Sequence, residues 1–323
     1  VTGANVAVTD TNAIILGAST ISGSYTLTAA GAVTDEGALA ISGDTTIVAG
    51  SGNDITLDHT SNNFGGGVKI TSGRNVTLVD ANLIILGDST VSGTYDVTAT
   101  SGGNINDNGV LAITGAATFT VAGGRNIILD QSSTFSSTVT FVPSSGTLNA
   151  VTIKDSTAFD IKAITTTGAL TVIAGGAITD SGNLTVGGIT TLEAGSGNNI
   201  TLDRVGNDFQ DAVKITSGNN VTLVDAGAID LGASTVSGTY AVTATASGDI
   251  TDSGVLAITG GATFTVANGR SITLDQSSTF SSTVTFVASA GTIAAVTIND
   301  SNAFDIKALT TTGNLTVTAG GAV

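Results

Sequence analysis

The chain repeats itself, and this repetition constrains its fold more than any other feature of the sequence. Residues 51–178 align without a gap on residues 196–323, a shift of 145, with 95 identities in 128 positions. A shorter repeat lies inside this one: relatives of the segment that begins at Asn75 start at Asn5, Ala150, Asn220 and Ala295, so that successive copies are offset by 70, 75, 70 and 75. Repeats of this length indicate a solenoid or an array whose units stack on their neighbours.

A still finer period is marked by aspartate, which closes almost every strand-like run. The twelve intervals between these Asp residues run from Asp10 to Asp300, range from 22 to 27 and average just over 24. We therefore predict a structural unit of about 24 residues that occurs about 13 times. The residues of this series are Asp10, Asp35, Asp58, Asp80, Asp107, Asp130, Asp155, Asp180, Asp203, Asp225, Asp252, Asp275 and Asp300.

The local pattern predicts β-strands. Runs such as Val76-Thr77-Leu78 and Ile55-Thr56-Leu57 alternate apolar and hydroxyl residues, which is the period of a half-buried strand. Ser-Gly, Gly-Gly and Asn-Gly pairs separate the runs and supply turn chemistry. No apolar pattern with the period of a helix persists long enough to form one, so we predict an all-β chain.

Among all-β folds, a right-handed parallel β-helix explains the near-copies best. Each unit of about 24 residues would be one coil, about 13 coils would stack, and the usual chirality of parallel crossovers would wind them to the right. The alternative is a row of tandem β-sandwich domains, which accounts for the repeat from Asn5 to Asn75 but not for the finer one. We predict a single continuous β-helix over 1–323, with super-repeats at 51–195 and 196–323, a partial copy at 1–50, and further repeats beyond this segment.

Differences between the two copies of the long repeat predict which side chains face solvent. Ile85 is replaced by Asp230, whereas the neighbouring Ile84 and Leu86 stay apolar in the second copy. Val48 is replaced in the same way by Glu193. We expect the replaced positions to face outward and the retained ones to face the core. The recurring phenylalanines are expected in the core as well: Phe64, Phe119, Phe135, Phe209, Phe264 and Phe280.

The composition excludes several classes of protein. With 41% hydrophobic residues and a mean hydropathy of +0.39, the chain is not a disordered acidic polymer. Its apolar runs are far shorter than the roughly 20 residues of a membrane-spanning helix. Nine basic against 25 acidic residues, for a net charge of −16, make nucleic acid an unsuitable partner. The absence of cysteine excludes disulfides and thiol chemistry.

The Asp series is the only charged feature with a period, and two interpretations fit it. In the first, which we favour, each Asp ends a strand and caps a turn through the backbone. In the second, the whole series forms a ladder of weak Ca²⁺ sites, since Ca²⁺ is bound by carboxylate and carbonyl oxygens. The single histidine, His59, has Arg204 as its counterpart and therefore reads as a solvated loop residue. We expect no catalytic residue and no cofactor.

Several segments resemble repeats of very large bacterial exoproteins of the filamentous-haemagglutinin type. The resemblance is carried by Gly175-Gly176-Ala177-Ile178-Thr179-Asp180-Ser181-Gly182-Asn183-Leu184-Thr185-Val186, by Asn199-Ile200-Thr201-Leu202-Asp203 and by Asn220-Val221-Thr222-Leu223-Val224-Asp225. It extends over essentially the whole chain. It implies a secreted or surface-attached right-handed β-helical shaft with a role in adhesion, matrix or filament formation.

Together these features predict a structural, non-enzymatic protein at the bacterial surface or outside the cell, either an adhesin stalk, a surface fibre or a matrix component. The expected partners are other copies or further repeats of the chain, joined end to end or laterally, with a cell-surface glycan or protein as a further partner. One alternative is an adhesin module that binds Ca²⁺ or glycan, and a weaker one is a β-helix enzyme that acts on polysaccharide.

Overall fold

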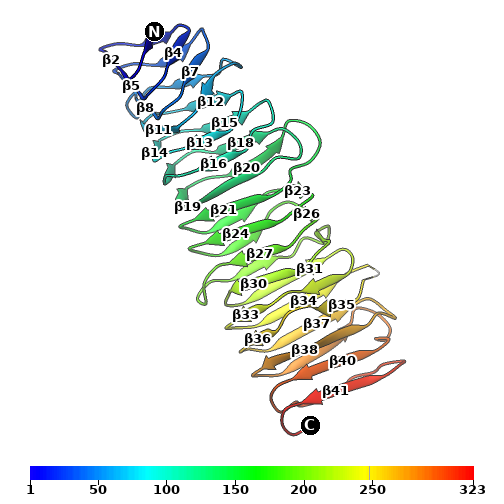
Figure 1. Ribbon diagram of the computed structural model, residues 1–323. Coiled ribbons are helices and arrows are strands. Elements are labelled where there is room, and N and C mark those ends of the chain that lie inside the picture. Colours follow the sequence, from blue (N-terminus) through cyan, green and yellow to red (C-terminus); the bar gives the residue numbers. More distant parts are fainter. Residues whose placement is uncertain (247) are drawn as a thin grey trace. The chain divides into compact units, whose positions relative to one another are not determined.

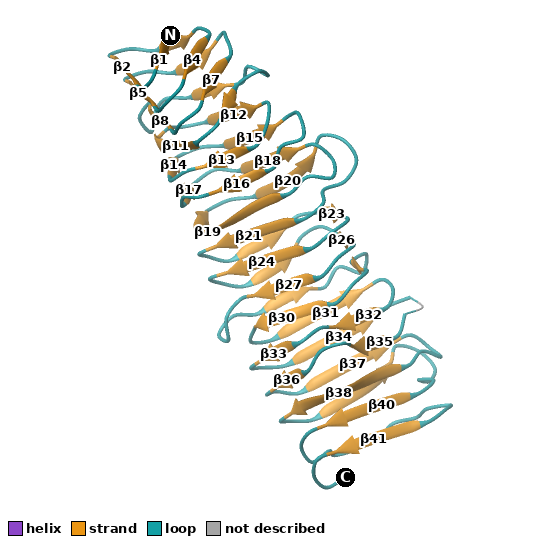
Figure 2. Ribbon diagram, in the orientation of Figure 1, coloured by secondary structure: helices purple, strands orange, loops and turns teal. Residues whose placement is uncertain are grey.

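The chain is a parallel β-solenoid of about 15 turns with about 21 residues per turn. A computed structural model describes residues 1–246 and 248–323, and it divides the chain into two compact units, Val1–Thr157 and Ala158–Val323. Figures 1 and 2 show that each unit consists of short strands joined by loops. Every strand pair within the described residues is parallel, and no helix occurs among them. The predicted all-β parallel solenoid is therefore confirmed.

One face of the first unit is a seven-stranded sheet in which each strand pairs with the strand one turn further along the chain. Its register runs unbroken from Ile14 through six turns to Val139. The strands are β3 (Ile14–Leu16), β6 (Val33–Asp35), β9 (Ile55–Leu57), β12 (Val76–Asp80), β15 (Tyr95–Ala99), β18 (Ala117–Val121) and β20 (Val139–Pro143).

The other faces of the first unit are built in the same way. One stack contains β1 (Thr2–Gly3), β4 (Ser19–Ile21), β7 (Leu39–Ile41) and β10 (Asn63–Phe64). A second contains β2 (Val6–Asp10), β5 (Tyr25–Ala29), β8 (Thr45–Val48) and β11 (Gly67–Ser72). Later turns add β13 (Ile84–Leu86), β14 (Ser89–Val91), β16 (Ile105–Asp107), β17 (Leu111–Ile113), β19 (Ile127–Phe135) and β21 (Val151–Asp155).

The second unit repeats this arrangement one long repeat further along the sequence. Its seven-stranded sheet contains β22 (Phe159–Ile161), β25 (Ile178–Asp180), β28 (Ile200–Leu202), β31 (Val221–Asp225), β34 (Tyr240–Ala244), β37 (Ala262–Val266) and β39 (Val284–Ala288). The other faces contain β23 (Ile164–Thr166), β24 (Leu170–Ala174), β26 (Leu184–Val186), β27 (Thr190–Glu193), β29 (Asp208–Phe209), β30 (Val213–Ser217), β32 (Ile229–Leu231), β33 (Ser234–Val236), β35 (Ile250–Asp252), β36 (Leu256–Ile258), β38 (Ile272–Phe280), β40 (Val296–Asp300) and β41 (Leu315–Ala319).

Alternating residues of each strand fill the interior. Ile84 and Leu86 are fully buried, while Ile85 between them is half-exposed, as the comparison of the two copies predicts. Asp230, the counterpart of Ile85, is half-exposed too. All six recurring phenylalanines lie in the core with at most 4% of their surface exposed. The predicted inward and outward positions are thus confirmed.

The predicted coil length and coil count are wrong, because the sequence repeat is not a whole number of turns and the true turn is shorter. The chain from β2 passes β5, β8 and β11, which complete three turns on one stack, and then enters β12 on a neighbouring stack. The repeat from Asn5 to Asn75 therefore spans about three and a third turns, and equivalent strands move to another face. Asp35 and Asp80 belong to one sheet, but Asp107 lies on another stack, so some Asp intervals are longer than a turn.

The β-sandwich alternative is wrong for both units, because their strands pair in parallel with strands one turn away. The right-handed winding stays a prediction. The continuity of one β-helix over residues 1–323 also stays a prediction. The division into two units falls between Thr157 and Ala158, inside the super-repeat 51–195.

Candidate functional site: the aspartate corners

The thirteen Asp side chains occupy three positions that recur in a fixed order. Five accept the backbone N–H two residues ahead and so cap their own turn: Asp10, Asp80, Asp155, Asp225 and Asp300. Four accept a backbone N–H from the next turn, 23 residues ahead: Asp35, Asp107, Asp180 and Asp252. The other four are the exposed residues that donate those N–H groups: Asp58, Asp130, Asp203 and Asp275.

Two of these positions meet at a corner that a buried asparagine completes. In the second unit, Asn207 is fully buried, and its Nδ2 donates to Asp180 Oδ2 at 2.7 Å. Its Oδ1 accepts the backbone N–H of Leu184 at 3.0 Å. From the following turn, Asp225 Oδ2 accepts the N–H of Phe209 at 2.8 Å. The corner thereby links three successive turns through side chains.

The first unit contains the same corner. Asn62 donates to Asp35 Oδ2 at 2.6 Å and accepts the N–H of Leu39 at 2.8 Å. Asp80 Oδ2 accepts the N–H of Phe64 at 2.7 Å. Because buried backbone groups away from the strand ladders need partners, these side chains satisfy N–H groups at the points where the chain bends.

A serine takes the place of the asparagine in the other two corners. Ser278 is fully buried, and its Oγ accepts the N–H of Leu256 at 2.9 Å. Ser133 does the same for Leu111 at 3.0 Å. The serine side chain carries no amide, and Asp252 Oδ2 is buried without a hydrogen-bond partner among the described residues. The carboxylate of this corner is thus less well satisfied than that of Asp180.

Burial controls the electrostatics of these corners. The pKa of Asp252 is raised to about 6, chiefly by desolvation; hydrogen bonds from backbone N–H groups oppose this rise, and the nearby Asp275 and Asp230 carboxylates add to it. Burial likewise raises the pKa of Asp107 to about 6 and that of Asp225 to about 6, each beside another carboxylate. Removal of a carboxylate from water disfavours its charged form, and a neighbouring negative charge acts in the same direction.

These shifts predict that the fold is more stable in mild acid than at neutral pH. A carboxyl whose pKa is higher in the folded than in the unfolded state stabilises the fold fully below the unfolded value, near 3.9, and this contribution is lost as the pH rises through about 6. We expect the free energy of unfolding to fall between pH 4 and pH 7. Arg74 lowers the pKa of Asp54 to about 2, so the stabilisation from this carboxylate is lost only at more acidic pH.

Chemical denaturation across this pH range tests the prediction. Asp252→Asn should reduce the difference in stability between pH 5 and pH 7.5 by about 1–2 kcal/mol, since one pKa unit corresponds to about 1.4 kcal/mol. Asp203→Asn makes the same change of charge at an exposed residue and serves as the control. An unchanged pH profile in Asp252→Asn would show that this carboxyl does not titrate with folding.

The Asp residues do not form one stacked column. Asp35 stands at the third position of its strand, in register with Leu16, whereas Asp80 stands at the fifth position, in register with Ala99. Asp58 lies between them, one residue beyond β9. In residues 1–246 and 248–323, no group of three or more His, Cys, Asp and Glu side chains is arranged to hold a metal ion. Binding of Ca²⁺ along the series stays a prediction.

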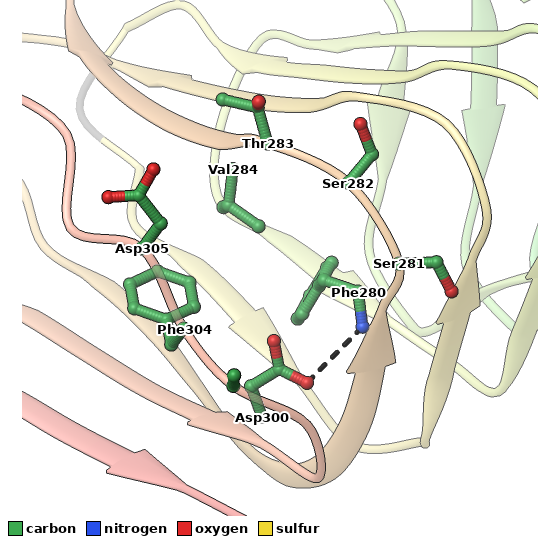
Figure 3. Close-up of a pocket in the computed structure, with 9 residues that line it drawn as sticks. Phe280, Ser281, Ser282, Thr283, Val284, Asp300, Phe304 and Asp305 are labelled. Atoms are coloured by element: carbon green, nitrogen blue, oxygen red, sulfur yellow. Dashed lines mark hydrogen bonds between the residues drawn. The ribbon is translucent and has the colours of Figure 1, made fainter. Parts of the chain in front are cut away.

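One of the pockets borders an aspartate corner of the second unit (Figure 3). Its volume is about 280 Å³, and its wall includes Phe280, Phe304 and the carboxyl group of Asp300. This carboxyl accepts the backbone N–H groups of Phe280 at 3.4 Å and of Asn302 at 3.0 Å. Asp305, also at the wall, pairs with Lys307. The acidic groups at this pocket are therefore already engaged by the protein itself.

Sequence reasoning missed the buried Asn and Ser residues of the corners. Comparison of the two copies could have found the asparagine. Within residues 61–67, only Asn62 and Phe64 are retained in the second copy, as Asn207 and Phe209. The retained asparagine among freely varying loop residues marks a position with a fixed contact. No periodic pattern in a single copy distinguishes it from the surrounding turn residues.

Parallel stacking, turn-by-turn register and recurring polar corners define the chain as a β-solenoid repeat protein. Comparison with family models shows that it belongs to the family of repeats of unknown function DUF5649, which matches residues 3–71, 73–142, 148–216, 218–287 and 293–323. The starts of these matches follow the same spacings as the relatives of the segment at Asn75, which confirms the repeat read from the sequence. No curated protein and no solved structure matches the chain. Among the described residues, no helix has the length and apolarity needed to cross a membrane.

Proposed function

We propose that this chain is a structural, non-enzymatic shaft or filament subunit that works outside the bacterial cell or on its surface, as an adhesin stalk, a surface fibre or part of a matrix. The observation that carries the proposal is the in-register stacking of successive turns. Within each unit, backbone hydrogen bonds of parallel strands join every turn to the next, so force along the stack acts on many bonds together.

The aspartate corners support the same role. Each corner with a buried asparagine links three successive turns where the chain leaves one face for the next, and these are the places where the strand ladders are interrupted. Buried networks whose members are satisfied rigidify a structure. Side-chain bonds at the corners therefore favour a stiff shaft over a flexible tether.

The hydrogen bonds made by the carboxyl groups with raised pKa favour a non-enzymatic role. Raised carboxyl pKa values often mark catalytic sites. Here the groups with raised pKa, such as Asp107 and Asp225, accept hydrogen bonds from backbone N–H groups of the same or the next turn. Their environment is explained by turn stabilisation, and no reaction is needed to account for it.

Placement outside the cell rests on the sequence. A cysteine-free, strongly acidic chain suits export and remains soluble at high local concentration. The resemblance of residues 175–186 to repeats of exoproteins of the filamentous-haemagglutinin type supports the same placement. The partners that this proposal implies are further repeats or other copies of the chain.

Duplication of residues 51–195 tests the shaft directly. Because this segment spans between six and seven turns, the duplicated protein should be longer by roughly 30 Å at about 4.8 Å per turn. Small-angle X-ray scattering of both proteins would measure the increment in maximum dimension, and the cross-section should stay unchanged. An increase in cross-section without an increase in length would contradict a rigid shaft.

Location is tested separately on the cells that produce the protein. Antibodies raised against this segment should label intact cells or the material around them. Label that appears only after permeabilisation would contradict a surface or extracellular role, whatever the result of the duplication.

A further inference from the structure

A small hollow lies on the surface of the first unit, where Gly67 and Gly87 line the wall without side chains. Gly65 and Gly66 form the bend between β10 and β11, and Gly67 is the first residue of β11. A Cβ atom on Gly66 would lie 2.6 Å from the backbone nitrogen of Asp44 in the preceding turn, so the two turns approach too closely for any side chain there. The hollow has a volume of about 180 Å³, and a Cβ atom on Gly67 would lie 3.5 Å from Asp44 Oδ1 in its wall.

Polar groups from four successive turns line the hollow around Gly67 and Gly87. Asp44 contributes a carboxylate from the first turn and Lys69 an ammonium group from the second, while Asp88 and Asn108 follow from the third and fourth turns. At about 4.8 Å per turn, Asp44 and Asp88 are separated by about 10 Å along the axis, a span that one sugar ring with its hydroxyls can bridge. The hydroxyl of Thr46 completes the lining.

The backbone holds each carboxylate through one oxygen, Oδ1. Asp44 Oδ1 accepts the N–H of Gly67 at 2.9 Å, and Asp88 Oδ1 accepts the N–H of Val110 at 2.9 Å. Asp88 Oδ2 is 3.9 Å from Lys69 Nζ, and both of these side chains are about half exposed or more. The hollow thus combines fixed acceptors with an exposed donor, and its formal charge is −1.

The second copy lacks this site. At the positions of Asp44 and Asp88 it carries Ile189 and Ala233, and the three glycines are replaced by Gln210-Asp211-Ala212. Ser253 stands at the position of Asn108, whereas the lysine and the threonine are retained. A corner needed only for folding would not require the polar set, since the second copy folds in the same way without it.

We propose that this hollow binds a neutral monosaccharide unit of a glycan, whose hydroxyls donate hydrogen bonds to the Oδ2 atoms of Asp44 and Asp88. Lys69 and Asn108 donate to the sugar oxygens, and Gly67 and Gly87, which carry no side chains, let the ring lie against the backbone. Carboxylates accept and ammonium and amide groups donate hydrogen bonds, which matches the mixed character of sugar hydroxyls. The net negative charge of the hollow and of the whole chain disfavours acidic sugars.

Nuclear magnetic resonance of the whole chain, titrated with the methyl glycosides of glucose, galactose and mannose, tests the proposal. At least one glycoside should shift the amide signals of Gly67 and Val110 in a saturable way, because these N–H groups are bonded to the two binding carboxylates. The double variant D44I/D88A, which places the residues of the second copy in the first, should bind at least tenfold more weakly. Its folding is expected because Ile189 and Ala233 occupy the same positions in the second unit.

The charge-matched variant D130N/D275N removes two exposed carboxylates elsewhere and should bind as the unaltered chain does. Three results would overturn the proposal: no saturable shift with any of the three glycosides, unchanged affinity in D44I/D88A, or the same shifts on addition of Ca²⁺ alone, which would make the hollow a cation site. None of these results bears on the length increment or the cell-surface label, so failure of the sugar site and failure of the proposed shaft are distinguishable.

Discussion

Replacement of Asn207 by Leu is expected to lower the free energy of unfolding by about 3–5 kcal/mol, because two buried groups, one of them a carboxyl, lose their hydrogen-bond partners. The leucine would leave the N–H of Leu184 without its acceptor and Asp180 Oδ2 without its donor, and both groups are buried in the corner. An unsatisfied buried group costs about 1–3 kcal/mol, and more when it is charged. Urea denaturation of the variant and the unaltered chain at pH 7.5 would measure the loss.

Asn207→Ser is the matched control, because the chain itself uses serine at the equivalent position of another corner. A serine can accept the N–H of Leu184 as Ser278 accepts that of Leu256. It would leave Asp180 Oδ2 unpaired, as Asp252 Oδ2 is, so we expect a loss of only about 1–2 kcal/mol. Equal stability of the Leu and Ser variants would contradict the role given to the asparagine.

Much of the fold could be predicted because each strand carries its own signal. The alternation in Val76-Thr77-Leu78 indicates that one side of the strand is buried. The replacement of Ile85 by Asp230 indicates which side of another strand faces solvent. Repetition then requires equivalent strands to stack, since one turn alone cannot bury its apolar side. Local pattern and repetition agree, and the parallel solenoid follows from both.

The length of a turn could not be read from the Asp series, because the sequence repeat and the structural repeat differ. Asp35, Asp58 and Asp80 lie on consecutive turns of one face, but the next member of the series, Asp107, belongs to another face. The interval from Asp80 to Asp107 therefore exceeds one turn. The sequence gives the number of residues between two Asp residues. How many of those residues lie in strands and how many in bends depends on how the turns stack.

The corners and the hollow escaped prediction for a related reason. Asn207 and Asp180 are 27 residues apart, and their contact exists only when the turns are in register. The hollow depends on residues 44 to 108, which four turns bring together. Sites of this kind are properties of the stacking register, so a comparison between copies reveals them better than any motif within one copy.

Phe264→Ala should have an effect of similar size through the core of the second unit. The Phe264 ring is fully buried, lies edge-to-face at 6.1 Å from Tyr240 and 6.2 Å from Phe280, and stacks on Phe286 at 6.1 Å. Truncation of a buried phenylalanine removes transfer free energy and leaves a cavity, which together cost about 3–5 kcal/mol. Denaturant melts would measure this loss, and Phe264→Leu should recover more than half of it because leucine fills most of the space.

The location of the effect is as informative as its size. A solenoid is stabilised by contacts between neighbouring turns, so a cavity in one turn should promote opening of the turns around it and leave remote turns intact. Hydrogen exchange in Phe264→Ala should therefore accelerate in β34, β37 and β39, which surround the cavity, and stay unchanged in β12, β15 and β18 of the first unit. The mirror variant Phe119→Ala should reverse this pattern, because Phe119 has the same neighbours in its own unit. If either variant accelerated exchange equally in both units, the chain would unfold as one cooperative body. Contacts between neighbouring turns would then not stabilise each unit separately.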